Sequence, residues 1–281
     1  MATTYRFYRP LDERRRQIRL VRPPGQHRGV IELKISGFSL DANPTFTALS
    51  YCWGSTDATI PISINGITFY VRPNLWAYLD RVRETGIFGS SWLFIDDICI
   101  DQSSMSERNS QVRLMGDVYR NARLVDVWLG VSEPVNDQDH RLFEVLAKLL
   151  RRQTQDETST SDELFALAKE CWGCFEAFNS LCEVAYWDRL WIVQELTLAK
   201  TVVIRYKTLI VDRMTMTEFY DLGYLAYQAL QETDKSPVGS SVKIKAHAPA
   251  DPFITVMTRK NGLGTRYTLR HNSLESQYAD V

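Results

Sequence analysis

The chain has 281 residues, 44% hydrophobic and 24% charged, which is enough apolar material for the core of an ordinary globular protein. Its 33 Lys and Arg against 34 Asp and Glu give a formal net charge of −1, which argues against nucleic acid or an anionic membrane as a partner. No apolar run is long enough for a membrane span, no secretory signal precedes the first strands, and five cysteines indicate reduced thiols in the cytoplasm.

The first predicted elements are strands. Residues 30–40 alternate apolar and polar, and residues 45–54 (TFTALSYCWG) form a second strand that runs into a glycine. The clearest local signal is ISINGITF, in which alternating isoleucines lead up to and away from Asn65-Gly66. This pattern predicts a β-hairpin with a two-residue turn that requires positive φ at both positions.

Helices and strands then alternate. A helix opens at Pro73-Asn74 and ends near Gly86, and a strand follows at 92–98. A second helix begins with a capping box of Ser104 and Glu107, and residues 124–130 form the next strand. This order predicts an α/β fold with a parallel sheet, in which ligands bind at the carboxyl ends of the strands.

Beyond Gly130 the pattern is mainly helical. Helices are predicted at 141–152, 162–183, 186–200 and 215–231, with extended structure around Lys207-Thr208. Cys171 and Cys174 form a CxxC, but no second pair completes a zinc set, so we expect buried helix-face cysteines and no metal site. Residues 235–281 are weakly patterned and are predicted to be a C-terminal extension or a linker.

Four motifs resemble a known family. ALSYCWG (48–54), NLWAYL (74–79), WLFIDDICIDQSSMSERNSQVRLMGDVYRNARLVDVWLG (92–130) and YWDRLWIVQELTLAK (186–200) closely resemble the fungal heterokaryon-incompatibility (HET) domain. The resemblance implies a HET domain over residues 1–234, with a helical insertion at about 131–185. It also implies a role in non-self recognition and regulated cell death. Self-association and an upstream receptor are the partners that we expect.

HET domains are in turn similar to Toll/interleukin receptor (TIR) domains. This similarity implies a flavodoxin-like, mostly parallel sheet flanked by helices, with an inserted hairpin. TIR domains often carry a W-C-x-x-E-L motif, whose glutamate is catalytic in those that hydrolyse NAD. WIVQEL places that glutamate at Glu195, with Ile192 in place of the usual cysteine. The resemblance therefore implies cleavage of NAD+ as substrate, with no bound cofactor.

Two other functions stay open. One is a non-enzymatic signalling module that triggers cell death by homotypic assembly or by binding a partner. The other is a catalytically inactive member of the family, which the missing cysteine at Ile192 allows.

The expected chemistry needs few residues. Cleaving NAD expels neutral nicotinamide from a pyridinium, so one carboxylate that stabilises an oxocarbenium-like transition state suffices. Glu195 is the expected catalytic residue; alternatively it is an exposed helix residue that pairs with Lys200 or Arg189. The expected substrate-binding residues lie at strand ends or in the WIVQEL segment: Ser50, Tyr51, Trp53, Gly54, Asp96, Asp97, Trp128, Arg189 and Trp191.

Several of these residues have alternative roles. Asp96 and Asp97 are expected to alternate across the strand end, and they either cap a helix, position a ligand or accept a phosphoryl group. The last role needs a further acid pair for Mg²⁺, which SYCWG does not provide. Trp53 and Trp128 either stack on a ligand ring or fill the core, and Arg189 binds either phosphates or a neighbouring acid.

Overall fold

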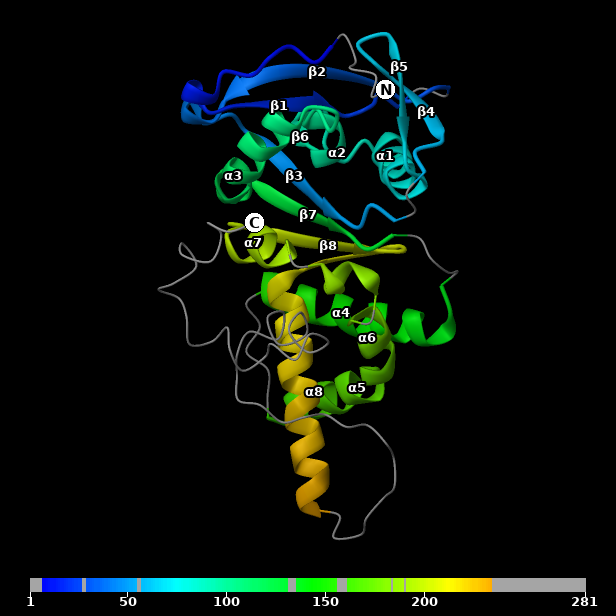
Figure 1. Cartoon of the computed structure of the whole chain (residues 1–281). Coiled ribbons are helices and arrows are strands. Elements are labelled where there is room, and N and C mark those ends of the chain that lie inside the picture. Colours follow the sequence, from blue (N-terminus) through cyan, green and yellow to red (C-terminus); the bar gives the residue numbers. More distant parts are fainter. Residues whose placement is uncertain are drawn as a thin grey trace. The chain divides into compact units, whose positions relative to one another are not determined.

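The computed structural model describes residues 7–26, 29–54, 57–130, 135–155, 161–182, 184–189 and 191–233. The chain divides into two compact units, Met1–Pro134 with Arg189–Asp212, and Val135–Asp188 with Arg213–Val281. The first unit contains the strands and the second is helical (Figure 1). The predicted extension at 235–281 lies outside the described residues.

The first unit is built on a sheet of nine strands within the described residues, in the order β5-β4-β2-β1-β6-β3-β7-β8-β9. The strands are β1 (Gln17–Arg22), β2 (Glu32–Ser39), β3 (Phe46–Tyr51), β4 (Ile60–Ile64), β5 (Ile67–Val71), β6 (Trp92–Phe94), β7 (Leu124–Trp128), β8 (Val202–Tyr206) and β9 (Leu209–Asp212). The central strands β6, β3, β7 and β8 are parallel, whereas β1 and β9 pair antiparallel with β6 and β8. The predicted α/β fold is confirmed, with a sheet that is mixed overall and parallel at its centre.

The parallel centre has a defined topology. Along the chain the four parallel strands come in the order β3, β6, β7 and β8. Across the sheet they lie in the order β6-β3-β7-β8, so the second strand of the chain lies beside the first, followed by the third and the fourth. Flavodoxin-like sheets have this order, and their ligands bind outside the carboxyl ends of the strands where the order reverses. In Figure 1 the strands β3, β7 and β8 follow one another across the sheet. The reversal therefore falls between β3 and β7.

Local sequence explains several of these elements. Every residue of β3 is buried, as expected of a strand with helices on both faces. The hairpin of β4 and β5 is confirmed, because Asn65 and Gly66 have φ of 51° and 79° and the flanking isoleucines pair in register. Strand β1 was not predicted, although its four central residues are buried.

The helices of the first unit are α1 (Pro73–Thr85), α2 (Asp96–Cys99), α3 (Met105–Asn121) and α7 (Ile192–Thr197). Helix α1 begins at Pro73 and ends before Gly86, which is left-handed, as predicted. The predicted strand 92–98 is wrong, since the chain leaves β6 after Phe94 and turns into α2. There the Asp97 N–H donates to its neighbour Asp96 over 2.8 Å, a local bond that competes with strand pairing.

The second unit is helical: α4 (Asp137–Gln155), α5 (Ser161–Gly173), α6 (Phe175–Cys182), the short turn η3 (Ala185–Asp188) and α8 (Arg213–Thr233). The predicted helix 162–183 is broken after Gly173, and Cys171 and Cys174 are buried there as expected. The predicted helix 186–200 is also wrong. Its start is η3, whose Tyr186 and Trp187 are buried, and among the described residues beyond η3 the α-helix is confined to α7.

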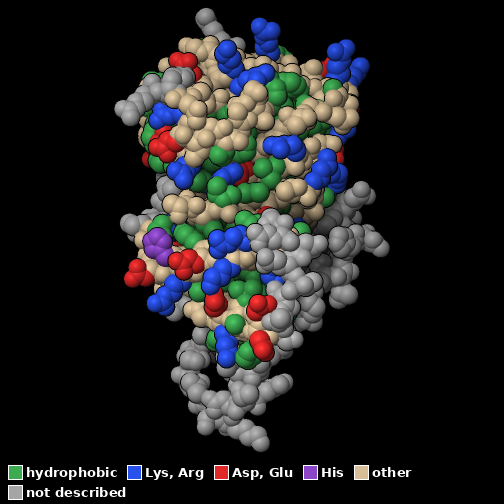
Figure 2. Space-filling view, turned by 180° about the vertical axis from the view of Figure 1, so that it is seen from behind, with side chains coloured by type: hydrophobic (Ala, Val, Ile, Leu, Met, Phe, Trp, Pro, Cys, Tyr) green, Lys and Arg blue, Asp and Glu red, His purple; other side chains and the backbone are tan. Residues whose placement is uncertain are grey.

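Two surface properties bear on partners. No helix in the described part of the chain is both long and apolar enough to cross a membrane. On the face that Figure 2 shows, Lys and Arg side chains are spread among acidic and uncharged ones. This distribution agrees with the formal net charge of −1.

Candidate functional site

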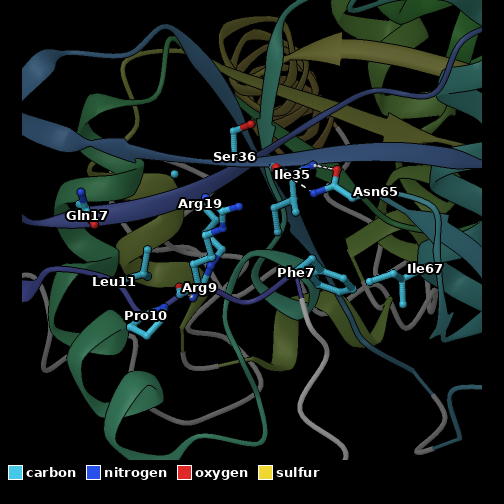
Figure 3. A pocket seen from close by; sticks show the side chains of 11 residues that line it. Phe7, Arg9, Pro10, Leu11, Gln17, Arg19, Ile35, Ser36, Asn65 and Ile67 are labelled. Atoms are coloured by element: carbon cyan, nitrogen blue, oxygen red, sulfur yellow. Dashed lines mark hydrogen bonds between the residues drawn. The ribbon is translucent and has the colours of Figure 1, made fainter.

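Two cavities of similar size lie among the described residues of the first unit. One, of about 630 Å³, lies against β1 and β2 and is lined by Phe7, Arg19 and Asn65 among others (Figure 3). Its buried cation, Arg19, is already neutralised by Glu107, with 3.0 Å between Nη2 and Oε2. None of the residues that the sequence predicts for the site lines this cavity.

The second cavity, of about 580 Å³, has the size of a small-molecule site and lies beside the ends of β3 and β6. Six of the predicted site residues line it: Trp53, Gly54, Asp96, Arg189, Trp191 and Glu195. They come from three segments that are far apart in the sequence. The fold therefore brings together most of the predicted site, and this cavity is the candidate functional site.

Glu195 lies on α7 and is only 2% exposed. The Ser50 hydroxyl on β3 donates a hydrogen bond to Oε2, and Arg189 Nη2 lies 3.7 Å from Oε1. Burial raises the pKa of Glu195, while Arg189 and hydrogen bonds from Ser50 and Tyr119 partly oppose this shift. Glu195 is thus not the exposed helix residue of the alternative interpretation, although its pairing with Arg189 is confirmed.

Asp96 is the second carboxylate of the cavity. The indole N–H of Trp53 donates to its Oδ2 over 3.0 Å, and the Gln102 amide donates to its backbone carbonyl over 3.0 Å. Burial, and then the charge of Glu195, raise the pKa of Asp96 to about 7, against the opposing effect of Arg189. The two carboxyl groups are therefore electrostatically coupled, and near neutral pH the pair readily holds a proton.

Asp97 and Tyr51 do not line the cavity. Asp97 forms an ion pair with Arg72, with 2.9 Å between Oδ1 and Nη1, and the Arg72 guanidinium lies 4.5 Å from the centre of the Trp53 ring. Asp97 thus fixes Trp53 through Arg72. Tyr51 is buried, and burial followed by the charges of Asp96 and Asp97 raises its pKa well above the usual value.

Trp128 also lies away from the cavity, in the core beneath α1. Its indole N–H donates to Asn74 over 2.9 Å, and the Asn74 amide donates to the Cys52 carbonyl over 2.6 Å. Asn74 therefore ties the end of β7 to the end of β3. Gly130 has a φ of 93°, and a Cβ there would lie 3.3 Å from the Asn74 side-chain oxygen, so glycine suits this close approach.

Part of the cavity wall was not predicted from the sequence. The missed lining residues lie after β3, in the loop after α2 and along α3: Cys52, Ile100, Gln102, Arg108, Asn109, Val112 and Met115. Val112 lines the cavity although it is 43% exposed, whereas Met115 is buried. The spacing of Arg108, Val112 and Met115 at i, i+4 and i+7 marks one helix face, a signal that was available in the sequence.

Metal ligation has no support in the described part of the chain, where no group of three or more His, Cys, Asp or Glu side chains is placed to hold an ion. The chemistry that the site offers is that of two coupled carboxyl groups, one serine hydroxyl, two arginines and a largely apolar wall with two tryptophans. Such a set can stabilise a positive charge on a ligand and exchange a proton with it.

A family model and a known protein that match this chain carry the same description, heterokaryon incompatibility. The model of the family "Heterokaryon incompatibility protein (HET)" matches residues 46–195. "Heterokaryon incompatibility protein 6, OR allele" of Neurospora crassa is 36% identical over 117 residues, which are 38% of this chain and 17% of that protein. The chain therefore spans only a small part of this relative's length. No solved structure matches the chain.

Proposed function

The chain belongs to the heterokaryon-incompatibility family, and on that premise we propose that it is a cell-death effector domain of fungal incompatibility that cleaves NAD+. The observation that carries the proposal is the position of Glu195, buried at the cavity beside Asp96 and held by Ser50 and Arg189. Raised carboxyl pKa values in a cavity are typical of catalytic sites.

In the proposed reaction the bond between the nicotinamide nitrogen and the ribose C1′ breaks. The electron pair goes to the nitrogen, so that nicotinamide leaves neutral and the ribose becomes an oxocarbenium-like cation. The ionised Glu195 stabilises this cation, and Ser50 and Arg189 keep its carboxylate in place. Water then adds to C1′ and loses a proton to Asp96, whose pKa of about 7 suits a general base near neutral pH. The products are nicotinamide, ADP-ribose and a proton.

The walls of the cavity support a flat ligand ring. Trp53 and Trp191 line it together with Val112 and Met115, and Trp191 is 43% exposed. Aromatic and apolar side chains bind the faces of ring systems and exclude water from the reacting bond. The nicotinamide ring would lie among these side chains, with its ribose toward Glu195.

A second function has its own support. Met105 and Val112 on α3 and Trp191 beside the cavity are exposed apolar side chains, which favours docking of another protein there. A second copy of the domain at this position would make cleavage dependent on self-association. Alternatively, such docking without any cleavage would make the chain a signalling module.

Substitution of Glu195 separates these functions. Glu195→Gln keeps the shape and the hydrogen-bonding capacity of the side chain but removes its charge. We expect nicotinamide release, measured by chromatography, to fall by about 100-fold or more. Glu84→Gln, at an exposed acid of α1, is the matched control and should behave as wild type. Full activity in Glu195→Gln would overturn the proposed chemistry, and killing by an inactive Glu195→Gln protein in fungal cells would support the signalling module.

A further inference from the structure

One arginine of the cavity has no part in the proposed reaction. Arg108 lies in the second turn of α3, is exposed and lines the cavity. Within the described part of the chain, its guanidinium makes no hydrogen bond or ion pair. The other arginine of the cavity, Arg189, is paired with Glu195. Arg108 therefore offers its charge and its donors to a ligand.

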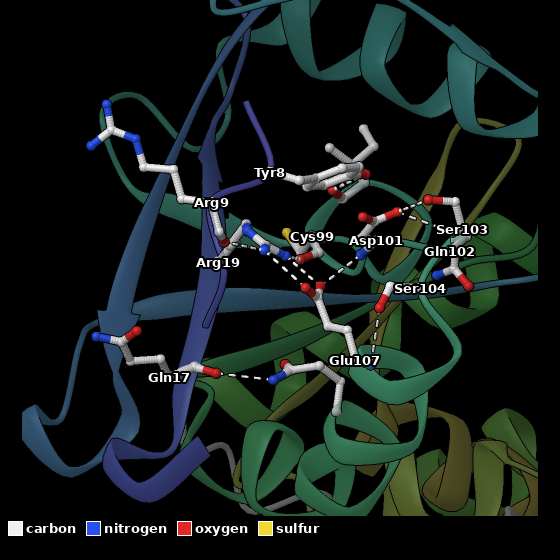
Figure 4. A network of polar contacts seen from close by, with 12 residues as sticks. Tyr8, Arg9, Gln17, Arg19, Cys99, Asp101, Gln102, Ser103, Ser104 and Glu107 are labelled. Carbon is white, nitrogen blue, oxygen red and sulfur yellow. Dashed lines mark hydrogen bonds and ion pairs between the residues drawn. The ribbon is translucent and has the colours of Figure 1, made fainter. Parts of the chain in front are cut away.

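The start of α3 is held firmly, and this fixes Arg108. Figure 4 shows Glu107, the preceding residue, accepting hydrogen bonds from Arg19 and from the backbone N–H of Asp101, the latter over 2.8 Å. Ser104 caps the helix by accepting from the Glu107 N–H over 3.3 Å. Adjacent helical residues do not face each other. Because Glu107 faces Arg19, its neighbour Arg108 is directed elsewhere, toward the cavity.

The cavity runs along α3 from Glu195 toward Arg108. A Cβ on Gly116, in the C-terminal half of α3, would lie 3.3 Å from Leu198 just beyond α7, and Tyr119 near the end of α3 lies close enough to Glu195 to lower its pKa. The Glu195 carboxyl group thus lies near the C-terminal half of α3. Arg108 is seven residues before Met115, a rise of about 10 Å along the helix. An elongated ligand is needed to reach both ends.

We propose that Arg108 binds the diphosphate of a dinucleotide whose glycosidic bond lies at Glu195. The inference rests on the proposed function for the identity of the ligand. A diphosphate lies one ribose away from the bond that breaks, and the planar guanidinium forms paired hydrogen bonds with phosphate oxygens. Asn109, exposed beside Arg108 and also lining the cavity, supplies an amide donor. Arg108 therefore selects ligands that carry phosphate beyond the ribose over unphosphorylated nucleosides.

The test is the binding of ADP-ribose, which has the diphosphate but no nicotinamide, measured by titration calorimetry. In Arg108→Gln the dissociation constant should rise by about tenfold or more. The matched control is Arg113→Gln, because Arg113 is an exposed arginine of the same helix that does not line the cavity. Arg113→Gln removes the same net charge and should change the constant less than twofold. Thermal unfolding of both variants checks that they are folded.

The outcomes separate this inference from the proposed reaction. Equal loss of ADP-ribose affinity in Arg108→Gln and Arg113→Gln would show that only the net charge of the helix matters, and it would overturn the inference. Unchanged affinity in Arg108→Gln would overturn it too. So would a wild-type protein that does not bind ADP-ribose. Nicotinamide release from NAD+ is measured in parallel. Binding of ADP-ribose that depends on Arg108, with no nicotinamide release, would keep the phosphate site and remove the proposed cleavage. Release that depends on Glu195, with binding indifferent to Arg108, would remove only this inference.

Discussion

The Ser50 hydroxyl donates a hydrogen bond to the Glu195 carboxylate, although 145 positions separate the two residues in the sequence. Ser50 belongs to β3, the first parallel strand, and Glu195 to α7. The region that matches the family model begins at Phe46, the first residue of β3, and ends at Glu195. The two ends of that region therefore meet at the candidate site, and the contact depends on the folding of the whole region between them.

Removing the Ser50 hydroxyl should change the pH dependence of the reaction. The hydrogen bond from Ser50 lowers the pKa of Glu195, so Ser50→Ala should raise that pKa further. If the ionised carboxylate is required, the acidic limb of the profile of kcat/KM against pH moves to higher pH. Ser63→Ala, on β4, is the control. An unshifted limb in Ser50→Ala would show that Glu195 does not determine it.

Asp96 should make folding stability depend on pH. Its pKa is about 7 in the folded protein and 3.8 as the ordinary value, so the protonated form favours the fold. The contribution is fully present below pH 3.8 and is lost as the pH rises through about 7. Asp96→Asn should remove this loss of stability with rising pH. The free energy of unfolding of Asp96→Asn minus that of the wild type should therefore rise by about 1–2 kcal/mol between pH 5 and 8, a figure reduced because Asp96 is partly exposed. Urea unfolding across that range measures it, and parallel curves for both proteins would refute it.

Asn74 should matter for stability more than an ordinary half-buried residue. Asn74→Ala leaves the Trp128 indole N–H and the Cys52 carbonyl without their partner, which should cost about 2 kcal/mol of unfolding free energy. Asn109→Ala, at an exposed asparagine, should stay within about 0.5 kcal/mol of wild type. Urea unfolding of the two variants gives the comparison. Equal stability of the two variants would mean that the hydrogen bonds of Asn74 to Trp128 and Cys52 do not stabilise the fold.

The Arg19–Glu107 pair should behave as a coupled unit. The side chain of Arg19 is 4% exposed and that of Glu107 14%, so removing either partner leaves a buried charge uncompensated. Arg19→Met should destabilise by about 3–5 kcal/mol, and Glu107→Gln in the Arg19→Met background should cost less than Glu107→Gln alone. A double-mutant cycle by chemical unfolding measures this coupling. If the changes in unfolding free energy of the two single variants add up to that of the double variant, the predicted coupling is contradicted.

The features best predicted from the sequence are turns and helix ends, because residues close together in the sequence determine them. The Asn65-Gly66 turn and the limits of α1 depend on local backbone preferences, and both were confirmed. The turn of Asp96 and Asp97 into α2 was missed because the apolar run of residues 92–95 resembles a buried strand and apolar residues resume at Ile98. Arg108 was missed for a different reason. Its spacing with Val112 and Met115 marks one face of α3, but which face borders the cavity depends on the contact of Glu107 with Arg19, 88 positions away in the sequence.

Release of nicotinamide from NAD+ by the purified wild-type protein, followed over a wide range of protein concentration, tests the proposed function most directly. Cleavage that depends on self-association predicts stoichiometric formation of nicotinamide and ADP-ribose, at a rate that rises more steeply than protein concentration. No release of nicotinamide, even from concentrated or crowded protein, would contradict NAD+ cleavage and favour the signalling module.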